Sequence, residues 1–139
     1  MTLDNVKFID SLNYFHMPLS ALPKAFGFPD TSKGTFPYLF NRPENVKYRG
    51  PLPGKNYYSP DSMSCSAREK FLSWHDEVTA SRYVFNFEEE IVRYCRKDVK
   101  ILKLACIAFR KSFLENGKIC PFTEATTIAS TCMRVYRIF

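Results

Sequence analysis

The chain has 139 residues, of which 45% are hydrophobic and 16% aromatic, so it has enough apolar mass for a globular core and is not largely disordered. Lysine and arginine exceed aspartate and glutamate by 20 to 14, and the net charge of +6 favours a polyanionic partner. The first residues, "MTLDNVKFID", contain acidic groups and no long apolar run, so the sequence predicts neither a secretory signal nor a membrane span. We expect the protein to act in the nucleus or the cytoplasm.

The cysteines and histidines do not form a recognisable metal motif. There is no C-x-x-C pair, and His16 and His75 are too far apart for a zinc-ligand pair. We therefore expect free, buried thiols in a reducing compartment. The thiols belong to Cys65, Cys95, Cys106, Cys120 and Cys132.

The first part of the chain predicts a short strand, a short helix and a long irregular segment. Residues 5–12 alternate as a strand does, and residues 16–28 have a helical pattern that begins at Pro18 and ends at Gly27. Residues 28–60 are rich in proline and glycine, which excludes a regular helix but not an ordered loop. The tyrosines and phenylalanines of this segment predict a packed, functional loop.

A second helix is predicted over residues 59–80. Its start falls near Ser64 or Ser66, because serine is a favoured N-cap residue. The apolar side chains that we expect to anchor this helix to a core are Phe71, Leu72, Trp74 and Val78.

Residues 88–113 predict a long amphipathic helix. Asn86 can cap it, Glu89 stands three residues later in a capping-box relation, and Gly117 follows as a stop. Apolar residues recur every three or four positions and share one stripe, namely Ile91, Cys95, Leu102, Cys106, Phe109 and Phe113. The opposite face is basic and holds Arg93, Arg96, Lys97, Lys100, Lys103 and Lys111.

Asp98 is unusual in this helix because it lies, with Tyr94, on the flank of the apolar stripe. A carboxylate at the margin of a core is costly unless it accepts hydrogen bonds or meets a cation. The basic residues of the same helix mostly point elsewhere. One interpretation is an ion pair between Asp98 and a basic residue of another segment, and the other is a functional carboxylate.

The C-terminal residues 120–139 predict a further helix that begins at about Thr123. The predicted elements are then one strand and several helices. A lone strand leaves backbone hydrogen-bonding groups unpaired, so the sequence predicts a fragment of a larger fold.

Several stretches, taken in order, resemble the protein-primed family B DNA polymerases of viruses, linear organellar plasmids and large self-synthesising DNA transposons. They are "DSLNYFHMPLSALPKAFG", "SKGTFPYLFN", "GPLPGKNYYSPDSM", "REKFLSWHDE", "EEEIVRYCRKDVKIL" and "CPFTEATTIASTCMRVYR". The resemblance implies an α/β fold with a mixed sheet, of which this chain would be a mostly helical part. Residues 1–117 would be the C-terminal part of a ribonuclease H-like 3′–5′ exonuclease domain, and residues 118–139 the truncated start of the polymerase palm.

Tyr94 and Asp98 are similar to the family's third exonuclease motif, Tyr-x-x-x-Asp. The resemblance implies that Asp98 is a ligand of a divalent metal, Mg²⁺ or Mn²⁺, and that the Tyr94 hydroxyl orients the attacking water. The spacing suits these roles, because residues four apart on a helix are neighbours and hard cations prefer oxygen ligands. Two such metals stabilise the attacking and leaving oxygens of a phosphodiester displacement.

Lys33-Gly34-Thr35-Phe36 resembles a Lys-x-x-hydrophobic motif of the same family. The resemblance implies that Lys33 steadies the scissile phosphate region, a role that suits a charged donor to phosphate oxygens. Without the flanking match, Lys33 is interpreted as a solvated loop lysine beside a turn glycine.

Ser11-Leu12-Asn13-Tyr14-Phe15 resembles the Ser/Thr-Leu-x-x-hydrophobic motif that holds the frayed single-stranded primer end. Ser11 would donate to phosphate or sugar, and Leu12 would pack against a base or sugar. The alternative is a strand end that enters a helix. The aromatic and basic segment 38–58 offers a further DNA contact by stacking, although internal packing is its favoured interpretation.

The resemblance implies a DNA-directed DNA polymerase with a proofreading exonuclease, which acts in DNA replication with DNA and a terminal protein primer as partners. An organellar element would place it in the mitochondrion. The family's exonuclease site also uses an Asp-x-Glu pair and a middle Asp, which this sequence does not contain, so we expect the isolated chain to be inactive. The alternative is a truncated or repurposed, non-catalytic remnant that binds nucleic acid through its basic surface.

Overall fold

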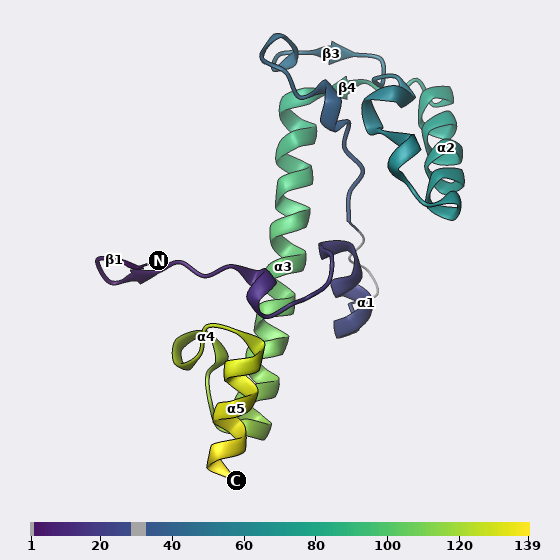
Figure 1. Ribbon diagram of the computed structural model, residues 1–139. Coiled ribbons are helices and arrows are strands. Elements are labelled where there is room, and N and C mark those ends of the chain that lie inside the picture. The colour runs from purple at the N-terminus through teal and green to yellow at the C-terminus, as the bar shows by residue number, and fades with distance from the viewer. Residues whose placement is uncertain (1, 29–32) are drawn as a thin grey trace. The chain divides into compact units, whose positions relative to one another are not determined.

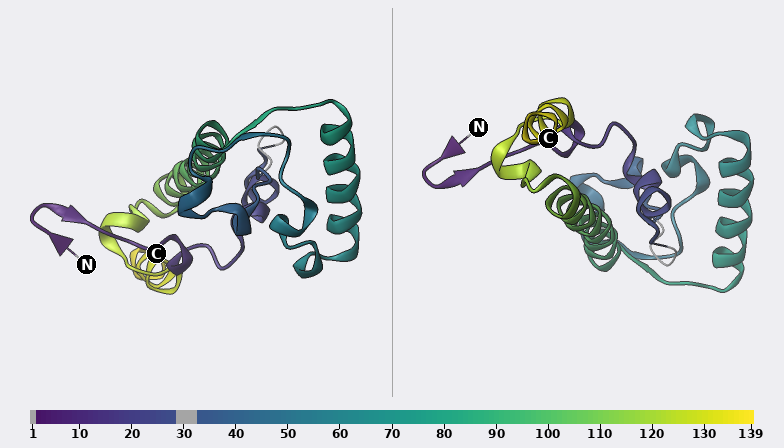
Figure 2. Two further views of the ribbon diagram at one scale, coloured as in Figure 1. Left: turned by 90° about the horizontal axis from the view of Figure 1, so that it is seen from above. Right: turned by 90° about the horizontal axis from the view of Figure 1, so that it is seen from below.

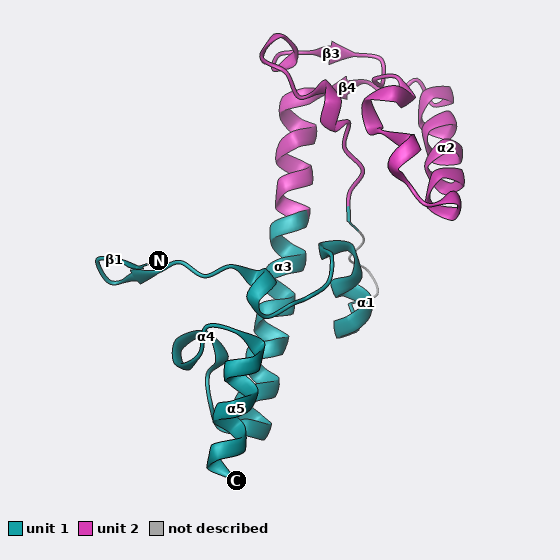
Figure 3. Ribbon diagram, in the orientation of Figure 1, with its two compact units in different colours: residues 1–33, 98–139 teal, residues 34–97 magenta. Residues whose placement is uncertain are grey.

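The computed structural model describes residues 2–28 and 33–139, which divide into two compact units (Figures 1 and 3). Unit 1 contains the described residues up to Lys33 and residues 98–139, and unit 2 contains residues 34–97. The long helix α3, Phe87–Gly117, contributes to both, because the division falls between Lys97 and Asp98.

Unit 1 begins with a small antiparallel hairpin that extends away from the helices of its unit (Figures 1 and 2). Strand β1, Thr2–Leu3, pairs with strand β2, Val6–Lys7. The predicted strand over residues 5–12 is therefore too long. It is broken because the Asp10 carboxylate accepts a hydrogen bond from the Leu12 amide at 2.9 Å and caps a 3₁₀ turn at Ser11–Asn13.

The predicted short helix is confirmed. A 3₁₀ turn at Leu19–Ala21 follows Pro18 and leads into α1, Leu22–Phe26. Gly27 ends α1 with a φ of 74°, in the left-handed region that glycine enters without strain.

The core of unit 1 is built on the second half of α3. Ile101 and Ala105 are fully buried there, and Phe109 lies one turn further along the same face. The Phe109 ring meets the Phe15 ring edge to face at 5.0 Å, an arrangement favourable to aromatic pairs. The other buried members of this core are Tyr14 and Leu22.

The buried seam of α3 runs beside the predicted stripe. Cys95, predicted on the stripe, is exposed. Tyr94, Asp98, Ile101 and Ala105 instead follow one another at spacings of four, three and four residues, so they share one face. Asp98 therefore lies in the seam and not on its flank. The predicted basic face is confirmed, since its six members are exposed: Arg93, Arg96, Lys97, Lys100, Lys103 and Lys111.

The C-terminal segment of unit 1 contains two helices, α4 at Pro121–Glu124 and α5 at Ile128–Ile138. The predicted start at Thr123 is wrong, because Thr127 and Ser130 form a capping box in which each side chain accepts from the other's backbone N–H at 3.1 Å. Helix α5 lies against the last turns of α3 (Figures 1 and 2). A Cβ on Gly117 would come within 2.7 Å of Val135, so the two helices approach closely there.

In unit 2, helix α2 spans Cys65–Ala80 and begins after Ser64, as predicted, although the Ser64 side chain makes no capping hydrogen bond. Phe71 and His75 are its buried residues. The His75 ring nitrogen Nε2 lies 2.9 Å from the carbonyl oxygen of Pro53, which ties the loop to the helix. His75 is therefore a core residue of this helix that was not among the predicted apolar anchors.

From residue 33 on, the long loop is ordered and packed, as predicted, while residues 29–32 of the predicted loop lie outside the described residues. It contains 3₁₀ turns at Tyr38–Phe40, Pro43–Asn45, Lys55–Tyr58 and Pro60–Ser62. Strand β3, Arg49–Gly50, pairs antiparallel with β4, Phe85–Asn86. A second core of aromatic side chains forms around this pair from Phe36, Phe40, Phe85 and Phe87. Its rings meet at 5.8–6.3 Å, for example between Phe36 and Phe87 and between Phe40 and Phe85.

The long helix is confirmed, and its first residue follows β4 directly. Asn86 and Glu89 do interact, as the predicted capping box suggested, but the observed contact joins their side chains. The Asn86 side-chain amide donates to the Glu89 carboxylate at 2.9 Å. Helix α3 ends at Gly117, the predicted stop.

Both sheets have two strands, and the described residues form no mixed sheet. The ribonuclease H-like fold and the domain boundary after residue 117 stay predictions. None of the helices in the described ranges combines the length and apolarity needed to cross a bilayer. All the cysteines are free, but the prediction that they are buried is wrong for Cys65, Cys95 and Cys132, which are exposed on helices.

The seam of α3 can be tested with two isoleucines of the same helix. Ile101 is fully buried and Ile107 is 54% exposed. Replacing Ile101 with alanine should lower the free energy of unfolding by about 2–5 kcal/mol, because it leaves a cavity. Ile107→Ala should change it by less than about 0.5 kcal/mol. Chemical denaturation of both variants measures the difference, and equal effects would contradict the observed seam.

Candidate functional site

Tyr94 is held by the aromatic core of unit 2. Its ring lies 5.4 Å from the Phe36 ring, tilted by 33°, and 5.7 Å from the Tyr38 ring at a nearly perpendicular angle. The hydroxyl groups of Tyr38 and Tyr94 are hydrogen-bonded to each other. Tyr94 therefore has a defined ring position and a defined direction for its hydroxyl group.

The segment that follows Lys33 reaches Tyr94 at Gly34. A Cβ built on Gly34 would lie 3.2 Å from Cδ2 of Tyr94 and 3.5 Å from Cδ of Lys97. The structure thus brings the lysine motif, through Gly34 and Phe36, onto the tyrosine of the Tyr-x-x-x-Asp motif. Lys33 itself is exposed.

Asp98 follows Tyr94 by one turn of the same helix. Its Oδ1 atom is buried and accepts no hydrogen bond from any residue in the described ranges. Asp98 also forms no ion pair with the described residues, so these residues do not support the ion-pair interpretation. A buried carboxylate oxygen without a donor is costly, so this oxygen calls for a functional explanation.

The residues Ser11 and Leu12 lie in unit 1. Ser11 helps to line a cavity of about 540 Å³ that is open to solvent. Leu12 is 63% exposed, so it is available to an incoming group. Both residues stand in the 3₁₀ turn that Asp10 caps.

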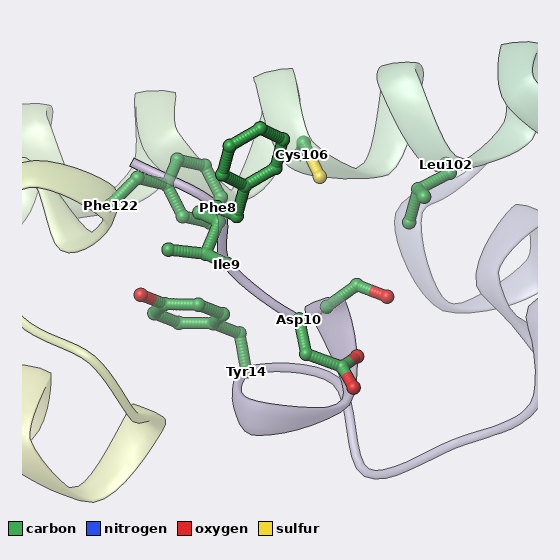
Figure 4. Close-up of a pocket in the computed structure, with 8 residues that line it drawn as sticks. Phe8, Ile9, Asp10, Tyr14, Leu102, Cys106 and Phe122 are labelled. Carbon is green, nitrogen blue, oxygen red and sulfur yellow. The ribbon is translucent and has the colours of Figure 1, made fainter. Parts of the chain in front are cut away.

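The cavity is mainly apolar and aromatic (Figure 4). The rings of Phe8, Tyr14 and Phe122 gather at one end, and Asp10 lies toward the other. The Tyr14 hydroxyl donates to the carbonyl oxygen of Ala125 at 3.1 Å, which holds that ring in place. The wall of the cavity on α3 is formed by Leu102 and Cys106.

Cys120 stands close to this region and is acidic for a thiol. Burial acts to raise its pKa, but hydrogen bonds from Thr123, Arg110 and the Phe122 backbone outweigh burial and lower the pKa to about 7. The neighbouring Tyr14 has a pKa above its ordinary value because of burial, to which the negative charge of Cys120 adds. Burial also raises the pKa of Cys106.

The described residues contain no cluster of three or more histidine, cysteine, aspartate or glutamate side chains that could hold a metal ion. The sequence likewise has no Asp-x-Glu motif, so any further ligands would come from outside this chain. The unpartnered oxygen of Asp98 fits one ligand position of a hard divalent cation.

Two residues of the site were missed by sequence reasoning. Tyr38 carries the hydroxyl partner of Tyr94, and Gly34 lies against the Tyr94 ring. Neither residue belongs to the same helix or strand as Tyr94, so no periodicity in the sequence indicates that they contact it. Their contact arises from the folding of the loop, which periodicity does not describe.

The chain is similar to known DNA polymerases along nearly its whole length. Residues 2–139 match the model of the family described as DNA polymerase type B, organellar and viral. The chain belongs to this family of type B DNA polymerases. It is also 26% identical over 133 residues to a protein of Podospora anserina named "Probable DNA polymerase", covering 96% of this chain and 10% of that protein. The chain thus spans about a tenth of that relative's length. No solved structure matches the chain.

The acidity of Cys120 predicts its reactivity. Alkylation of Cys120 by iodoacetamide should reach half of its maximal rate near pH 7, because the thiolate is the reacting form. Arg110→Ala should move this midpoint upward, since it removes a donor that favours the thiolate. Peptide mass spectrometry across pH measures both, with Cys106 as an internal comparison that needs a higher pH. A midpoint at about 8.5, the value of a free thiol, would contradict the assignment.

Proposed function

We propose that this chain is part of a DNA-directed DNA polymerase and supplies residues of its 3′–5′ proofreading exonuclease. The family match supports the polymerase, and the environment of Asp98 supports the exonuclease. The observation that carries the proposal is the buried Oδ1 atom of Asp98, which no donor of the described residues satisfies. The cost of this oxygen is explained if Asp98 exists to bind a cation in the complete enzyme.

The cation is Mg²⁺ or Mn²⁺, to which Asp98 contributes one carboxylate in the complete enzyme. When bound, such ions stabilise the charge on the attacking and leaving oxygens of a phosphodiester. The remaining ligands come from the other exonuclease carboxylates of the family, which this sequence does not contain. The isolated chain should therefore lack metal-dependent nuclease activity.

Tyr94 acts through its hydroxyl group, which orients a water molecule toward the scissile phosphate. A positioned hydroxyl needs a fixed ring and a second partner that sets its rotation. Phe36 and Gly34 contact the ring, and Tyr38 contacts the hydroxyl. Lys33 is exposed at the start of the same loop and supplies positive charge to the phosphate.

The single-stranded primer end binds at the turn that contains Ser11 and Leu12. The Ser11 hydroxyl donates to a phosphate or sugar oxygen, while the exposed Leu12 side chain packs against a base or sugar. The aromatic cavity beside Ser11 can shelter a nucleoside group without reading its identity. This site would be independent of sequence, as proofreading of any primer end requires.

The exonuclease assignment is tested in a full-length polymerase that carries these residues. Asp98→Ala should lower the rate of 3′–5′ degradation of single-stranded primers by about 10³-fold or more, because it removes a metal ligand. Tyr94→Phe should lower it less, by about 10- to 100-fold, because only the positioning of water is lost. Both rates are normalised to the folded fraction of each variant.

Polymerisation by the same two variants serves as the control and should be unchanged, since its catalytic groups lie in another domain of the family. If Asp98 were an ion-pair anchor, Asp98→Ala would lower the melting temperature while degradation per folded molecule stayed close to the parent. Normal degradation by Asp98→Ala would remove the catalytic assignment and favour a non-catalytic, nucleic-acid-binding remnant.

Single-stranded DNA binding is tested on the 139-residue chain itself. Binding should be weak, independent of sequence and strongly reduced by salt. The logarithm of the affinity should fall with the logarithm of the salt concentration, with a slope of about −0.7 for each phosphate neutralised. Ser11→Ala and Leu12→Ala should each weaken binding about fivefold, the loss expected for about 1 kcal/mol. Leu114→Ala is the matched control, because Leu114 is an exposed leucine that lies outside this turn and outside the segment 38–58. Fluorescence anisotropy measures these affinities, and an affinity that does not change with salt counts against the site.

A further inference from the structure

Gly34 is tightly surrounded for a residue without a side chain. A Cβ at this position would lie 3.2 Å from Cδ2 and 3.8 Å from Cε2 of the Tyr94 ring, and 3.5 Å from Cδ of Lys97. The first of these distances is shorter than ordinary van der Waals contact, so the ring would have to move by a few tenths of an ångström. The missing side chain is therefore what allows the loop backbone to rest on Tyr94.

The backbone conformation of Gly34 does not itself require glycine. Of the described glycines, only Gly27 has a positive φ. An alanine at position 34 would therefore meet a steric obstacle from its neighbours and not from its own backbone. The close approach to Tyr94, and not a positive φ, is therefore what favours glycine at position 34.

The Tyr94 ring is contacted from other directions as well. Phe36 packs at 5.4 Å between ring centroids, and Tyr38 packs at 5.7 Å and is hydrogen-bonded to the Tyr94 hydroxyl. A ring displaced by a Cβ at position 34 must disturb one of these contacts. Because Tyr38 sets the direction of the hydroxyl, displacement of the ring changes where that hydroxyl points.

We propose that Gly34 is a positioning residue of the exonuclease site, whose missing side chain seats the Tyr94 ring and the stem of Lys97 against the loop that begins at Lys33. This inference rests on the proposed function of Tyr94. Gly34 is the point at which the lysine motif contacts the tyrosine motif. The two motifs then keep a constant relation to each other, as near-attack geometry requires.

The kinetic test uses Gly34→Ala in a full-length polymerase, with Gly54→Ala as the matched control. Gly54 has no atom within 4 Å of an added Cβ, and its φ of −58° suits alanine. Gly34→Ala should lower kcat for excision of a single-stranded primer end by about tenfold, short of the hundredfold that a full misplacement can cost. KM for the primer end and polymerisation should stay at parental values, and Gly54→Ala should match the parent throughout.

The background of Tyr94→Phe separates positioning from structural damage. This variant keeps the ring that meets the added Cβ but has no hydroxyl group to misplace. Gly34→Ala should therefore cost nothing further in excision when combined with Tyr94→Phe. A loss of the same size in both backgrounds would overturn the positioning role.

A measurement without catalysis completes the test. In the 139-residue chain labelled with ¹³C at tyrosine rings, Gly34→Ala should shift the ring resonances of Tyr94 and Tyr38, while Gly54→Ala should leave them unchanged. Unshifted resonances in Gly34→Ala overturn the inference whatever the enzyme does. Parental excision by Gly34→Ala beside an inactive Asp98→Ala also overturns it, and leaves the proposed function intact. Parental excision by Asp98→Ala instead removes the proposed function and the role assigned to Gly34 with it.

Discussion

A buried carboxylate oxygen without a donor is the constraint on which the candidate site depends. Asp98 lies in the same seam of α3 as the fully buried Ile101 and Ala105, where an apolar residue would be the ordinary choice. Asp98 as a whole is half-buried, and its Oδ1 atom is buried without a donor among the described residues. Helical geometry fixes its neighbour Tyr94 one turn away, so the two polar groups cannot separate without breaking the helix.

The aromatic core of unit 2 holds the Tyr94 ring in place. Phenylalanine rings surround the point where the loop, the β3–β4 pair and the start of α3 meet. Tyr38 and Tyr94 are the polar members at the margin of this core, and their hydroxyl groups satisfy each other. Close-packed rings have little freedom to shift, so a loop without regular structure can hold a functional group as firmly as a strand does. The aromatic side chains of unit 2 thus order a loop that is rich in proline.

The sequence predicted those parts of the structure that local rules control. The helix at residues 88–113, the end of α1 at Gly27 and the start of α2 after Ser64 follow from periodicity and from punctuating residues. It failed where a single side-chain hydrogen bond ended a pattern, as the Asp10 cap does to the strand and the Thr127 box does to the last helix.

The partners of the candidate site were harder to foresee than its members. Tyr94 and Asp98 were found because four-residue spacing is visible in a sequence. The contacts of Tyr94 with Gly34 and Tyr38 join positions about sixty residues apart, and only the fold of the loop creates them. The placement of Asp98 within the seam was also misjudged, because Cys95 looks apolar in the sequence but is exposed in the structure.

The β1–β2 hairpin exposes unpaired strand edges together with apolar side chains. Its strands leave their outer edges open, and Leu3 and Val6 are more than half exposed, as is Phe8 just beyond them. Open edges with apolar side chains pair readily with edges of other molecules. The net charge of +6 keeps copies apart at low ionic strength, but salt shortens the reach of that repulsion to about 8 Å at physiological strength. Raising the ionic strength therefore weakens the charge repulsion that opposes pairing at these exposed edges.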